Sequence, residues 1–493
     1  LDIQALEADG RTGDFLIAKA AYSLRSLGTR QATLAATGDT VARANGKFVA
    51  QVRRNVNGDL KSFTATEVTD GTLLSFVNES FTSSLPLDVA GSAAAAYGLR
   101  NLSSSYSGNV VEVRRSIDDT TQNFTAAEVT DGTLVNFVTQ EVEGYKNNPS
   151  YIRYFGTGDI SNVTTTSFDI DAGSTGNLYV YANGSGQVIE FGVGDIVEVN
   201  LSVTGLTVAG RLLLYRTNSG NVASSLNHTF SNGDNQTVSA VATAAGGQIG
   251  FGTLRSPDGG SITINSVKVT GQSGHVKTWY DQSGNSNDAA QATAASQPKI
   301  VSAGALVTDG IDFDGTDDVL ETSVVPPNAA TLIGVANFDV LSSTQLIVGA
   351  RDSTNQRSYL GLQSTNVSVL GNATGTLTGG SISAGADFLL FGVHAVDKRL
   401  LSTNGTVVSN TSGAASDNTT RGYSIGGFNN AGTNASFVNG KVSEVIIYAS
   451  DQSDNRRAIE ESIAGHHGIT LASFNRDGFV KTWYDQSVTN EAG

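Results

Sequence analysis

The chain has no cysteine and no methionine, and only 15% of its 493 residues are charged. The absence of cysteine excludes disulfides, thiolate metal sites and cysteine nucleophiles. Basic residues are scarce as well, since 30 Lys and Arg face 46 Asp and Glu and leave a net charge of −16. Because no cluster of Lys or Arg could replace the counterions of a phosphate backbone, we expect no nucleic-acid partner and no anionic membrane partner.

Long apolar runs are also missing. No run approaches the roughly 18 residues of a membrane-spanning helix, so we expect no membrane segment. The opening LDIQALEADG has neither a methionine nor the charged-then-apolar pattern of a signal segment, so we expect Leu1 to be a processed or truncated start. Glycine, by contrast, is abundant at 56 residues, alongside much Asn, Ser and Thr. This usage is typical of β-rich proteins with many turns, and the length predicts two to four domains.

A repeat of about 30 residues occurs twice. VAQVRRNVNGDLKSFTATEVTDGTLLSFV at Val49–Val77 realigns without gaps onto VVEVRRSIDDTTQNFTAAEVTDGTLVNFV at Val110–Val138, a shift of 61 residues. An Ala-rich run precedes each copy, AAYSLRSL at Ala20–Leu27 and AAYGLRNL at Ala95–Leu102. We predict for each copy a short helix in the Ala-rich run, a strand ending in paired arginines, and a second short helix or turn.

A shorter segment, VKTWYDQS, also occurs twice. It lies at Val276–Ser283 and again at Val480–Ser487, and the two copies contain both tryptophans of the chain. The second copy lies close to the end of the given sequence, which raises the question of which part of the fold it completes.

Most of the remaining sequence has the pattern of strands. Segments with alternating apolar residues, such as GDIVEVNLSV and TLIGVANFDV, are separated by Gly, Asn or Asp from 150 to 272 and again from 275 to 450. One helix is clear in SDQSDNRRAIEESIAGHHGIT, where Ala458, Ile459, Ile463 and Ala464 form an apolar stripe that Gly468 ends. We therefore predict an all-β, multidomain β-sandwich or jelly-roll fold with a few short helices.

The pairing of AYGLRNLSSSYSGNVVEVRRSIDDTTQNF with WYDQSGNSNDAAQAT resembles the catalytic β-sandwich of the α-L-arabinofuranosidase B family, and more closely its relatives among phage structural proteins. Residues 91–138 and 275–470 carry this resemblance. The tail GKVSEVIIYASDQSDNRRAIEESIAGHHGI looks like the closing strand and helix of concanavalin-like, laminin-G-like jelly rolls. The resemblance implies a two-sheet sandwich.

In that family the FV segment runs almost directly into YDQSGN, whereas Val138 and Trp279 are far apart here. We therefore predict nested domains. Residues 1–78 begin an outer sandwich to which 476–493 return, and 79–149 with 273–475 form an inner sandwich into which a carbohydrate-binding-module-like jelly roll, 150–272, is inserted. Sequence beyond Gly493 or another subunit would complete the outer sandwich. The alternative is a degenerate tandem repeat whose tail merely begins a third copy.

Aromatic side chains are candidates for stacking on sugar rings. The candidates for such platforms are Trp279, Tyr280, Tyr179 and Tyr181. For Trp279, as for Trp483, a core anchor is the favoured alternative. Tyr179 and Tyr181 share one face of a strand, which is as readily core as platform.

The structural residues of the two motifs form a second set. They are Asp281, Arg114 and Arg115 in one copy and Trp483, Asp485, Arg53 and Arg54 in the other. We expect the aspartates to tie down the loop after each tryptophan, and the arginines to be partners of buried acids, with the same aspartates as candidates. Trp483 and Asp485 should then lie beside the first repeat.

Catalysis of the resembled type needs two carboxylates about 5–5.5 Å apart. The resemblance places the nucleophilic Glu near Gln363 and Ser364 and the acid/base Asp at Phe428, and residues 353–386 contain neither Asp nor Glu. We therefore expect no enzyme activity.

We also expect no cofactor and no metal. We interpret the acidic residues of TDGIDFDGTDD as the solvent-exposed face of a strand and the turn after it. A calcium site is the weaker alternative.

The resemblance to phage structural proteins implies a non-catalytic virion surface protein, such as a tail fibre, capsid fibre or decoration protein, that presents lectin-like domains, and the composition permits this role. The expected partners are other virion proteins, further copies of the chain and host-surface polysaccharide, and the expected location is the virion surface or another extracellular site. A secreted arabinofuranosidase-type hydrolase and a bacterial surface adhesin are the two alternatives.

Overall fold

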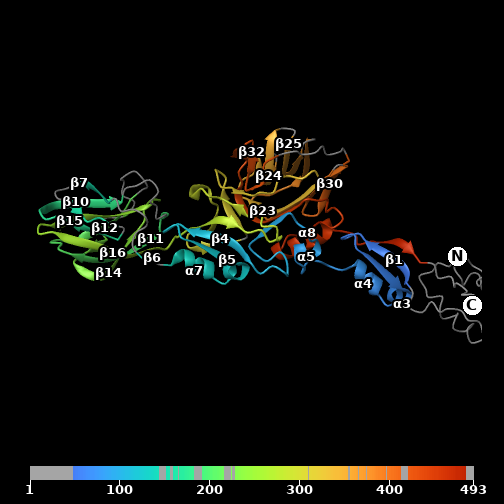
Figure 1. Cartoon of the computed structure of the whole chain (residues 1–493), viewed down its shortest axis with the longest axis horizontal. Helices are drawn as coiled ribbons and strands as arrows, with labels where there is room; N and C mark the ends of the chain where they lie inside the picture. The colour runs from blue at the N-terminus through green and yellow to red at the C-terminus, as the bar shows by residue number, and fades with distance from the viewer. Residues whose placement is uncertain are drawn as a thin grey trace, which may run out of the picture.

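The computed structural model describes residues 48–140, 142–143, 151–155, 159–164, 166–182, 191–215, 224, 228–308, 310–353, 356–364, 366–372, 375–395, 397–411 and 420–484. They form a small three-stranded unit, a central sandwich and a distal sandwich, one after another along the long axis (Figure 1). The predicted all-β sandwich class is confirmed. No helix in these ranges has the length and apolarity needed to cross a membrane. The run 20–27 and Asp485 lie outside the described residues.

The small unit is a sheet with the strand order β2-β1-β35 and two helices on it. Its elements are β1 (Phe48–Arg54), β2 (Leu60–Thr64), α3 (Ala65–Thr69), α4 (Thr72–Val77) and β35 (Gly478–Trp483). The last strand of the described chain thus lies beside the first.

The distal sandwich has two sheets, ordered β13-β12-β15-β10-β7 and β14-β11-β16-β9-β8, with β6 on β16. Its strands are β6 (Val142–Glu143), β7 (Tyr151–Phe155), β8 (Ile160–Ser161), β9 (Ser167–Ile170), β10 (Ser174–Ala182), β11 (Ile196–Thr204), β12 (Gly210–Tyr215), β13 (Thr229–Phe230), β14 (Gly233–Val241), β15 (Gln248–Ser256) and β16 (Gly260–Val269). Both sheets contribute apolar side chains to one shared core.

The central sandwich is one network of hydrogen-bonded strands with short helices at its margins. Its strands are β3 (Ala95–Gly98), β4 (Asn109–Arg115), β5 (Thr121–Thr125), β17 (Gly274–Trp279), β18 (Ala289–Ala290), β19 (Lys299–Ser302), β20 (Ala305–Leu306), β21 (Ile311–Asp314), β22 (Leu320–Glu321), β23 (Ala330–Phe338), β24 (Gln345–Ser353), β25 (Gln356–Gln363), β26 (Val367–Asn372), β27 (Gly375–Ser381), β28 (Phe388–Ala395), β29 (Lys398–Thr403), β30 (Thr406–Asn410), β31 (Ser424–Ile425), β32 (Phe428–Asn430), β33 (Thr433–Ala435) and β34 (Asn439–Tyr448). Its helices are α5 (Pro86–Val89), α6 (Ala126–Thr130), α7 (Thr133–Thr139), the 3-10 turn η2 (Ala294–Ser296) and α8 (Arg456–His467).

Strand β23 is buried on both faces, which explains its continuous apolar run TLIGVA. Successive side chains point to opposite faces: Leu332 lies in the core shared with β24–β26, and Ile333 lies in a second core under α8. The predicted apolar stripe of α8 is buried, and Gly468 ends the helix in a left-handed conformation at φ 66°. The helix therefore forms a third layer on the sheet.

The two copies of the repeat, Val49–Val77 and Val110–Val138, have the same strand pairing. Ala50 pairs with Phe63 in β1–β2, and Val111 pairs with Phe124 in β4–β5. The return strands repeat the match, because Ala50 also pairs with Trp483 and Val111 with Trp279. The described part of the second VKTWYDQS, Val480 to Tyr484, therefore lies beside the first repeat.

Local sequence accounts for the paired helices in each repeat. Thr64 accepts a hydrogen bond from the N–H of Glu67, whose carboxylate accepts one from the N–H of Thr64, and this capping box begins α3. Gly71 then takes φ 91°, a left-handed conformation that a side chain would strain, and α4 begins. The second copy has the same capping box and the same glycine 61 residues later.

The helix predicted for Ala95–Leu102 is wrong, because its first four residues form strand β3. Alanine favours helices, but here all four residues are buried and pair with β34, with Ala95 opposite Ile447. Tertiary pairing satisfies their backbone groups where one isolated helical turn could not.

Each repeat is interrupted at the same place, between its second helix and its return strand. The distal sandwich intervenes between α7 and β17, and the central sandwich between α4 and β35. At the first junction, Ser116 accepts a hydrogen bond from the N–H of Ser273 and donates one to Gln272. At the second, Arg476 binds both carboxylate oxygens of Glu461 at 2.6 Å and also the carbonyl of Glu79. The leaving and returning segments are also joined directly, because β6, which follows α7, pairs with β16 at the first junction and Arg476 binds the carbonyl of Glu79 at the second.

The two tryptophans test the difference between the copies, because Trp279 is fully buried and Trp483 is 47% exposed. We expect Trp279→Ala to lower the free energy of unfolding of the central sandwich by about 3–5 kcal/mol. Trp483→Ala should cost about 1 kcal/mol, since much of its ring is already in water. Chemical denaturation measures both values. In fluorescence, Trp483→Ala should emit at shorter wavelength than Trp279→Phe, and the reverse order would contradict the assignment.

Candidate functional site

The four predicted sugar platforms do not converge on one surface. Trp279 is a core residue whose ring centroid lies 6.0 Å from that of Tyr97, so the prediction of a platform at Trp279 is wrong. Tyr280 is half-buried and donates a hydrogen bond to Asn123 at 2.8 Å. Tyr179 and Tyr181 lie on β10 in the distal sandwich.

Tyr179 is half-buried, and its ring lies over Gly252, where a Cβ would come within 2.7 Å of it. The backbone of Tyr181 pairs with Ile152 and Gly250, and its side chain lies outside the described structure. A sugar platform at Tyr280, Tyr179 or Tyr181 stays a prediction.

Asp281 and Gln282 hold the AYGLRNL segment through its backbone. The Asp281 carboxylate accepts from the N–H of Ala96 at 2.9 Å and from the N–H of Ser283 at 2.8 Å. Gln282 accepts from the N–H of Leu102 and donates to the carbonyls of Gly98 and Arg100. These contacts explain why WYDQS and AYGLRNL belong together.

The expected pairing of the arginines with Asp281 is wrong, because the Asp281 oxygens accept from Ala96 and from backbone and side-chain donors of their own loop. Arg114 instead binds Asp119 at 2.8 Å, and Arg115 binds Asp118 at 2.5 Å. Both acids lie in the turn that follows β4, so each repeat supplies its own partners.

In the first repeat, Arg54 binds Asp59 and Glu79, and its guanidinium lies 4.5 Å from the ring centroid of Phe76. Arg53 lies over the ring of Phe479 at 5.5 Å. The predicted role of Asp485 falls outside the described residues.

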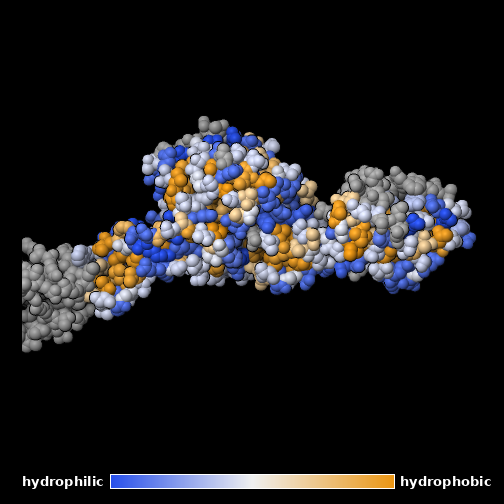
Figure 2. Space-filling view, turned by 180° about the vertical axis from the view of Figure 1, so that it is seen from behind, coloured by the Kyte–Doolittle hydropathy of each residue, from blue (hydrophilic) through white to orange (hydrophobic). Residues whose placement is uncertain are grey.

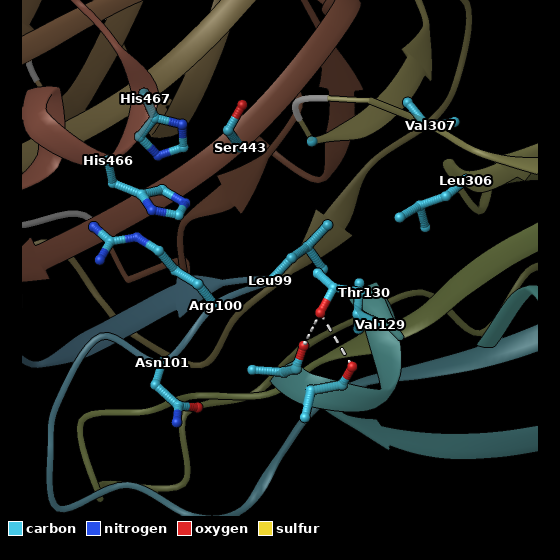
Figure 3. A pocket seen from close by; sticks show the side chains of 13 residues that line it. Leu99, Arg100, Asn101, Val129, Thr130, Leu306, Val307, Ser443, His466 and His467 are labelled. Atoms are coloured by element: carbon cyan, nitrogen blue, oxygen red, sulfur yellow. Dashed lines mark hydrogen bonds between the residues drawn. The ribbon is translucent and has the colours of Figure 1, made fainter. Parts of the chain in front are cut away.

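A cavity of about 480 Å³ opens between the end of β3, helix α6 and the C-terminal end of α8. Figure 3 shows Arg100, His466 and His467 on one side of it and Leu306 and Val307 on the other. Its volume is in the range of small-ligand sites, and an apolar wall with a few polar groups is the usual construction of such sites.

A buried carboxylate organises the polar side. Glu444 is 1% exposed, and its Oε2 lies 3.0 Å from Arg100 Nη2 and 3.2 Å from His467 Nε2. Burial alone would raise the pKa of Glu444, but Arg100 and His467 outweigh it and hold that pKa below its usual range. Glu444 is therefore ionised at neutral pH and positions the two cationic or hydrogen-bonding neighbours that face the cavity.

Two polar groups at the cavity are available to a ligand. Neither the Asn101 amide nor the His466 ring has a hydrogen-bond partner among the described residues. Partial desolvation, followed by the charges of Arg100 and His467, lowers the pKa of His466 to about 4. The imidazole is therefore neutral at pH 7, with one donor and one acceptor nitrogen. Thr130, in contrast, uses its hydroxyl on the carbonyls of its own helix.

The sequence did not point to this cavity as a site. Two signals could have done so: the Leu99–Asn101 part of the AYGLRNL segment and the His466–His467 pair in the last turn of α8. Each segment alone is typical of a structural role. Only the fold shows that Glu444 on β34 lies between them and binds both Arg100 and His467.

The positions at which the resemblance places catalytic acids stand apart from the cavity. Gln363 lies on β25 and Phe428 on β32, where the Phe428 ring lies 6.2 Å from that of Tyr359. Neither residue lines the cavity.

An acidic cluster lies at the turn after β21. Carboxylate oxygens of Asp314, Asp317 and Asp318 all lie within 4.8 Å of one another. Ile311 and Phe313 are buried and Asp314 is exposed, as the strand interpretation predicts, while Asp312 is half-buried. The three clustered carboxylates are hard oxygen ligands of the kind that calcium takes. Asp309 lies outside the described residues.

Comparison with known proteins gives partial likenesses only. No family model and no curated protein matches the chain. A sialidase from Trypanosoma rangeli is 17% identical over 38% of this chain and 31% of its own, with a TM-score of 0.29. The CBM40 domain of a Ruminococcus gnavus IT-sialidase, bound to α2,3-sialyllactose, is 14% identical over 31% of this chain and 95% of its own (TM-score 0.27).

A heptameric SAP-like pentraxin from Limulus polyphemus is 15% identical over 34% of this chain and 92% of its own, with a TM-score of 0.25. At such scores these likenesses do not indicate what this chain binds. None of the three is a phage protein or an arabinofuranosidase, so those two parts of the resemblance stay predictions.

Asp318 provides a test of the acidic turn. Burial, followed by repulsion from Asp314 and Asp317, raises the pKa of Asp318 to about 7. Because this pKa is above that of the unfolded chain, the protonated form stabilises the fold below about pH 4, and this stability is lost as pH rises to about 7. We expect Asp318→Asn to remove that loss and to be more stable than the wild type at pH 8 by roughly 2–4 kcal/mol.

Denaturation curves at pH 5 and pH 8 measure the effect, with Asp258→Asn, a change at an exposed aspartate of the distal sandwich, as the control. An equal pH dependence in the wild type and Asp318→Asn would contradict the assignment. If calcium binds the turn, its addition should stabilise the wild type at pH 8 and leave Asp318→Asn unchanged.

Proposed function

We propose that the chain is a non-catalytic carbohydrate-binding surface protein whose central sandwich binds a glycan in the cavity beside Leu99–Asn101. One observation carries this proposal: Asn101 and neutral His466, without hydrogen-bond partners among the described residues, face an apolar wall across a cavity of about 480 Å³. Sugars present hydroxyl groups along one edge and C–H groups on their faces, so they match polar groups opposite an apolar wall.

Binding without catalysis is the proposal because the carboxylate nearest the cavity is committed. Glu444 is buried, ionised and bonded to Arg100 and His467, so it is unsuited to donate a proton to a leaving group. A retaining or inverting hydrolase needs a second carboxylate facing the first. Thr130, Ser443 and Asn101, which line the same cavity, supply none.

The nested arrangement supports a role at the surface of a virion, such as a tail fibre, capsid fibre or decoration protein. In this proposal 1–78 with 476–493 are an outer domain, 79–149 with 273–475 an inner domain, and 150–272 an inserted one. Each inserted domain is joined to its host by two chain segments instead of one linker: β6 pairs with β16 at the first junction, and Arg476 binds the carbonyl of Glu79 at the second. In this role the chain would hold its glycan site rigidly toward a host-surface polysaccharide, and its neighbours would be other virion proteins.

Binding to host-surface polysaccharide fragments tests the proposal. We expect Asn101→Ala and His466→Ala each to weaken binding about tenfold, because each removes hydrogen bonds worth about 1–1.5 kcal/mol. Titration calorimetry with glycans selected on an array measures the change. Tyr280→Phe, which removes a hydroxyl outside the cavity, is the matched control and should bind as the wild type does.

Unchanged binding by both cavity variants would contradict the proposed site, and loss of binding in a Tyr280→Ala variant, which removes the stacking ring, would transfer the site to the sequence-predicted platform. Release of free sugar by the wild type, abolished in Glu444→Gln, would instead establish a hydrolase.

A further inference from the structure

Helix α8 contacts two regions of the molecule that lie far apart in the sequence. At its C-terminal end, His466 and His467 face the cavity beside Leu99–Asn101 (Figure 3). Near its N-terminal end, the N–H of Ala458 donates a hydrogen bond to the carbonyl of Val56, in the turn between β1 and β2 of the small unit. These two contacts are about 12 Å apart along the helix, at a rise of about 1.5 Å per residue. Helix α8 therefore connects the small unit to the cavity.

The segment that joins the small unit to the central sandwich lies along one face of α8. Ser462 donates a hydrogen bond to the carbonyl of Ser84 at 2.6 Å. One turn later, a Cβ at Gly465 would come within 2.3 Å of the carbonyl oxygen of Thr82, so only glycine permits this close approach. Another face of the helix carries Ile463 into the core beneath it. The helix is thus held between the sheet and the connecting segment.

A buried carboxylate clamps the helix to this segment and to the returning chain. Glu461 is 4% exposed, and its oxygens accept hydrogen bonds from Arg476 at 2.6 Å and from the N–H of Phe81 at 3.3 Å. Arg457, one turn earlier in α8, also binds Glu461 at 2.9 Å. Arg476 binds the carbonyl of Glu79 as well. The leaving segment, the returning segment and α8 therefore meet at one carboxylate.

The same network continues into the small unit. The side chain of Glu79 pairs with Arg54 at the end of β1. In the turn that follows, the N–H of Asn55 donates to the carbonyl of Asp477 at 3.0 Å, and the Asn55 side chain accepts from the N–H of Asp477 at 3.0 Å. Figure 2 shows hydrophilic residues gathered where the small unit, toward the left of that view, meets the central sandwich. The small unit is thus bonded to both segments that hold α8.

We propose that Glu461 and Arg476 are positioning residues of the cavity, which fix His466 and His467 by clamping α8 to the small unit. Neither Glu461 nor Arg476 lines the cavity, so both act through the helix. Rigid secondary elements of this kind carry coupling between separate sites. A movement of the small unit would then change how the cavity holds its ligand. That this ligand is a glycan rests on the proposed function, whereas the coupling along α8 does not.

Histidine signals in NMR spectra of the full chain test the coupling. We expect Arg476→Ala to shift the imidazole signals of His466 and His467 and to leave that of His228, in the distal sandwich, unchanged. Arg476→Lys, which keeps the charge, should restore part of the wild-type signals. The matched control is Lys277→Ala, which removes one cation from an ion pair elsewhere in the central sandwich and should shift neither signal of the pair.

The absence of cysteine allows a second measurement with paired spin labels at Lys61→Cys in the small unit and Val325→Cys in the central sandwich. We expect one narrow distribution of distances between the labels, which Arg476→Ala broadens. Glu461→Gln, which keeps the size of the side chain and removes its charge, should broaden it as well. A broad distribution without either change would overturn the proposal. Signals of His466 and His467 that stay unchanged in both variants would also overturn it.

Binding of the glycan fragments selected on the array gives the functional measurement. We expect Arg476→Ala to weaken binding about threefold, within the range by which residues outside two sites change the coupling between them. Lys277→Ala should bind as the wild type does. Equal affinity in the wild type and Arg476→Ala would contradict the positioning role. A wild-type chain that binds no glycan would contradict the proposed function instead, and the histidine signals would still decide the coupling.

Discussion

The hydrogen bonds from Asp281 and Gln282 to the backbone of residues 96–102 are the contact on which the central sandwich depends. They join two segments almost 200 positions apart. Because they are made to backbone atoms, the side chains of residues 96–102 can make other contacts. Tyr97 uses its ring to cover Trp279, and its hydroxyl binds the carbonyl of Asn287. Arg100 then emerges at a fixed position from which it reaches Glu444 at the base of the cavity.

The same logic explains why a domain can be inserted twice at one position. In each repeat the chain leaves the host sheet after the second helix and returns to it at the strand that ends in tryptophan, β17 or β35. The second arginine of each pair lies at this crossing: Arg54 and Arg115 are each held by an acid of the following turn and by the carbonyl of Phe76 or Phe137. Because these contacts are local, they form whether or not a domain intervenes. Loop closure over a long insertion adds only a modest entropic cost when the inserted domain brings its own ends together.

Strand periodicity predicted the sheets well, because alternation of side chains is a local property. The sequence predicted one short helix or turn where two helices form, although Thr64 and Gly71, which begin them, are also local features. The Ala95–Gly98 strand could not be predicted, since its conformation is decided by pairing with β34, far along the chain. The sequence suggests Asp281 as a partner of the arginines because it does not show that Ala96 and Ser283 already donate hydrogen bonds to the Asp281 carboxylate. The cavity could not be predicted because it also depends on distant contacts. In the sequence Glu444 is one residue of a strand, and only the packing of α8 brings His467 to it.

Glu444 also shows how a buried carboxylate can organise the lining of a cavity without changing its own protonation state. A catalytic acid must change its protonation near the working pH, whereas Arg100 and His467 hold the pKa of this carboxylate low and keep it ionised. Neutralising Glu444 would leave Arg100 without its anion in a largely buried setting, a cost that favours the ion pair over proton transfer. The carboxylate therefore acts on the cavity through the two side chains that it orients. A hydroxyl placed there would meet the Arg100 guanidinium and the neutral imidazole of His466, whose donor and acceptor nitrogens define the hydrogen-bond geometry.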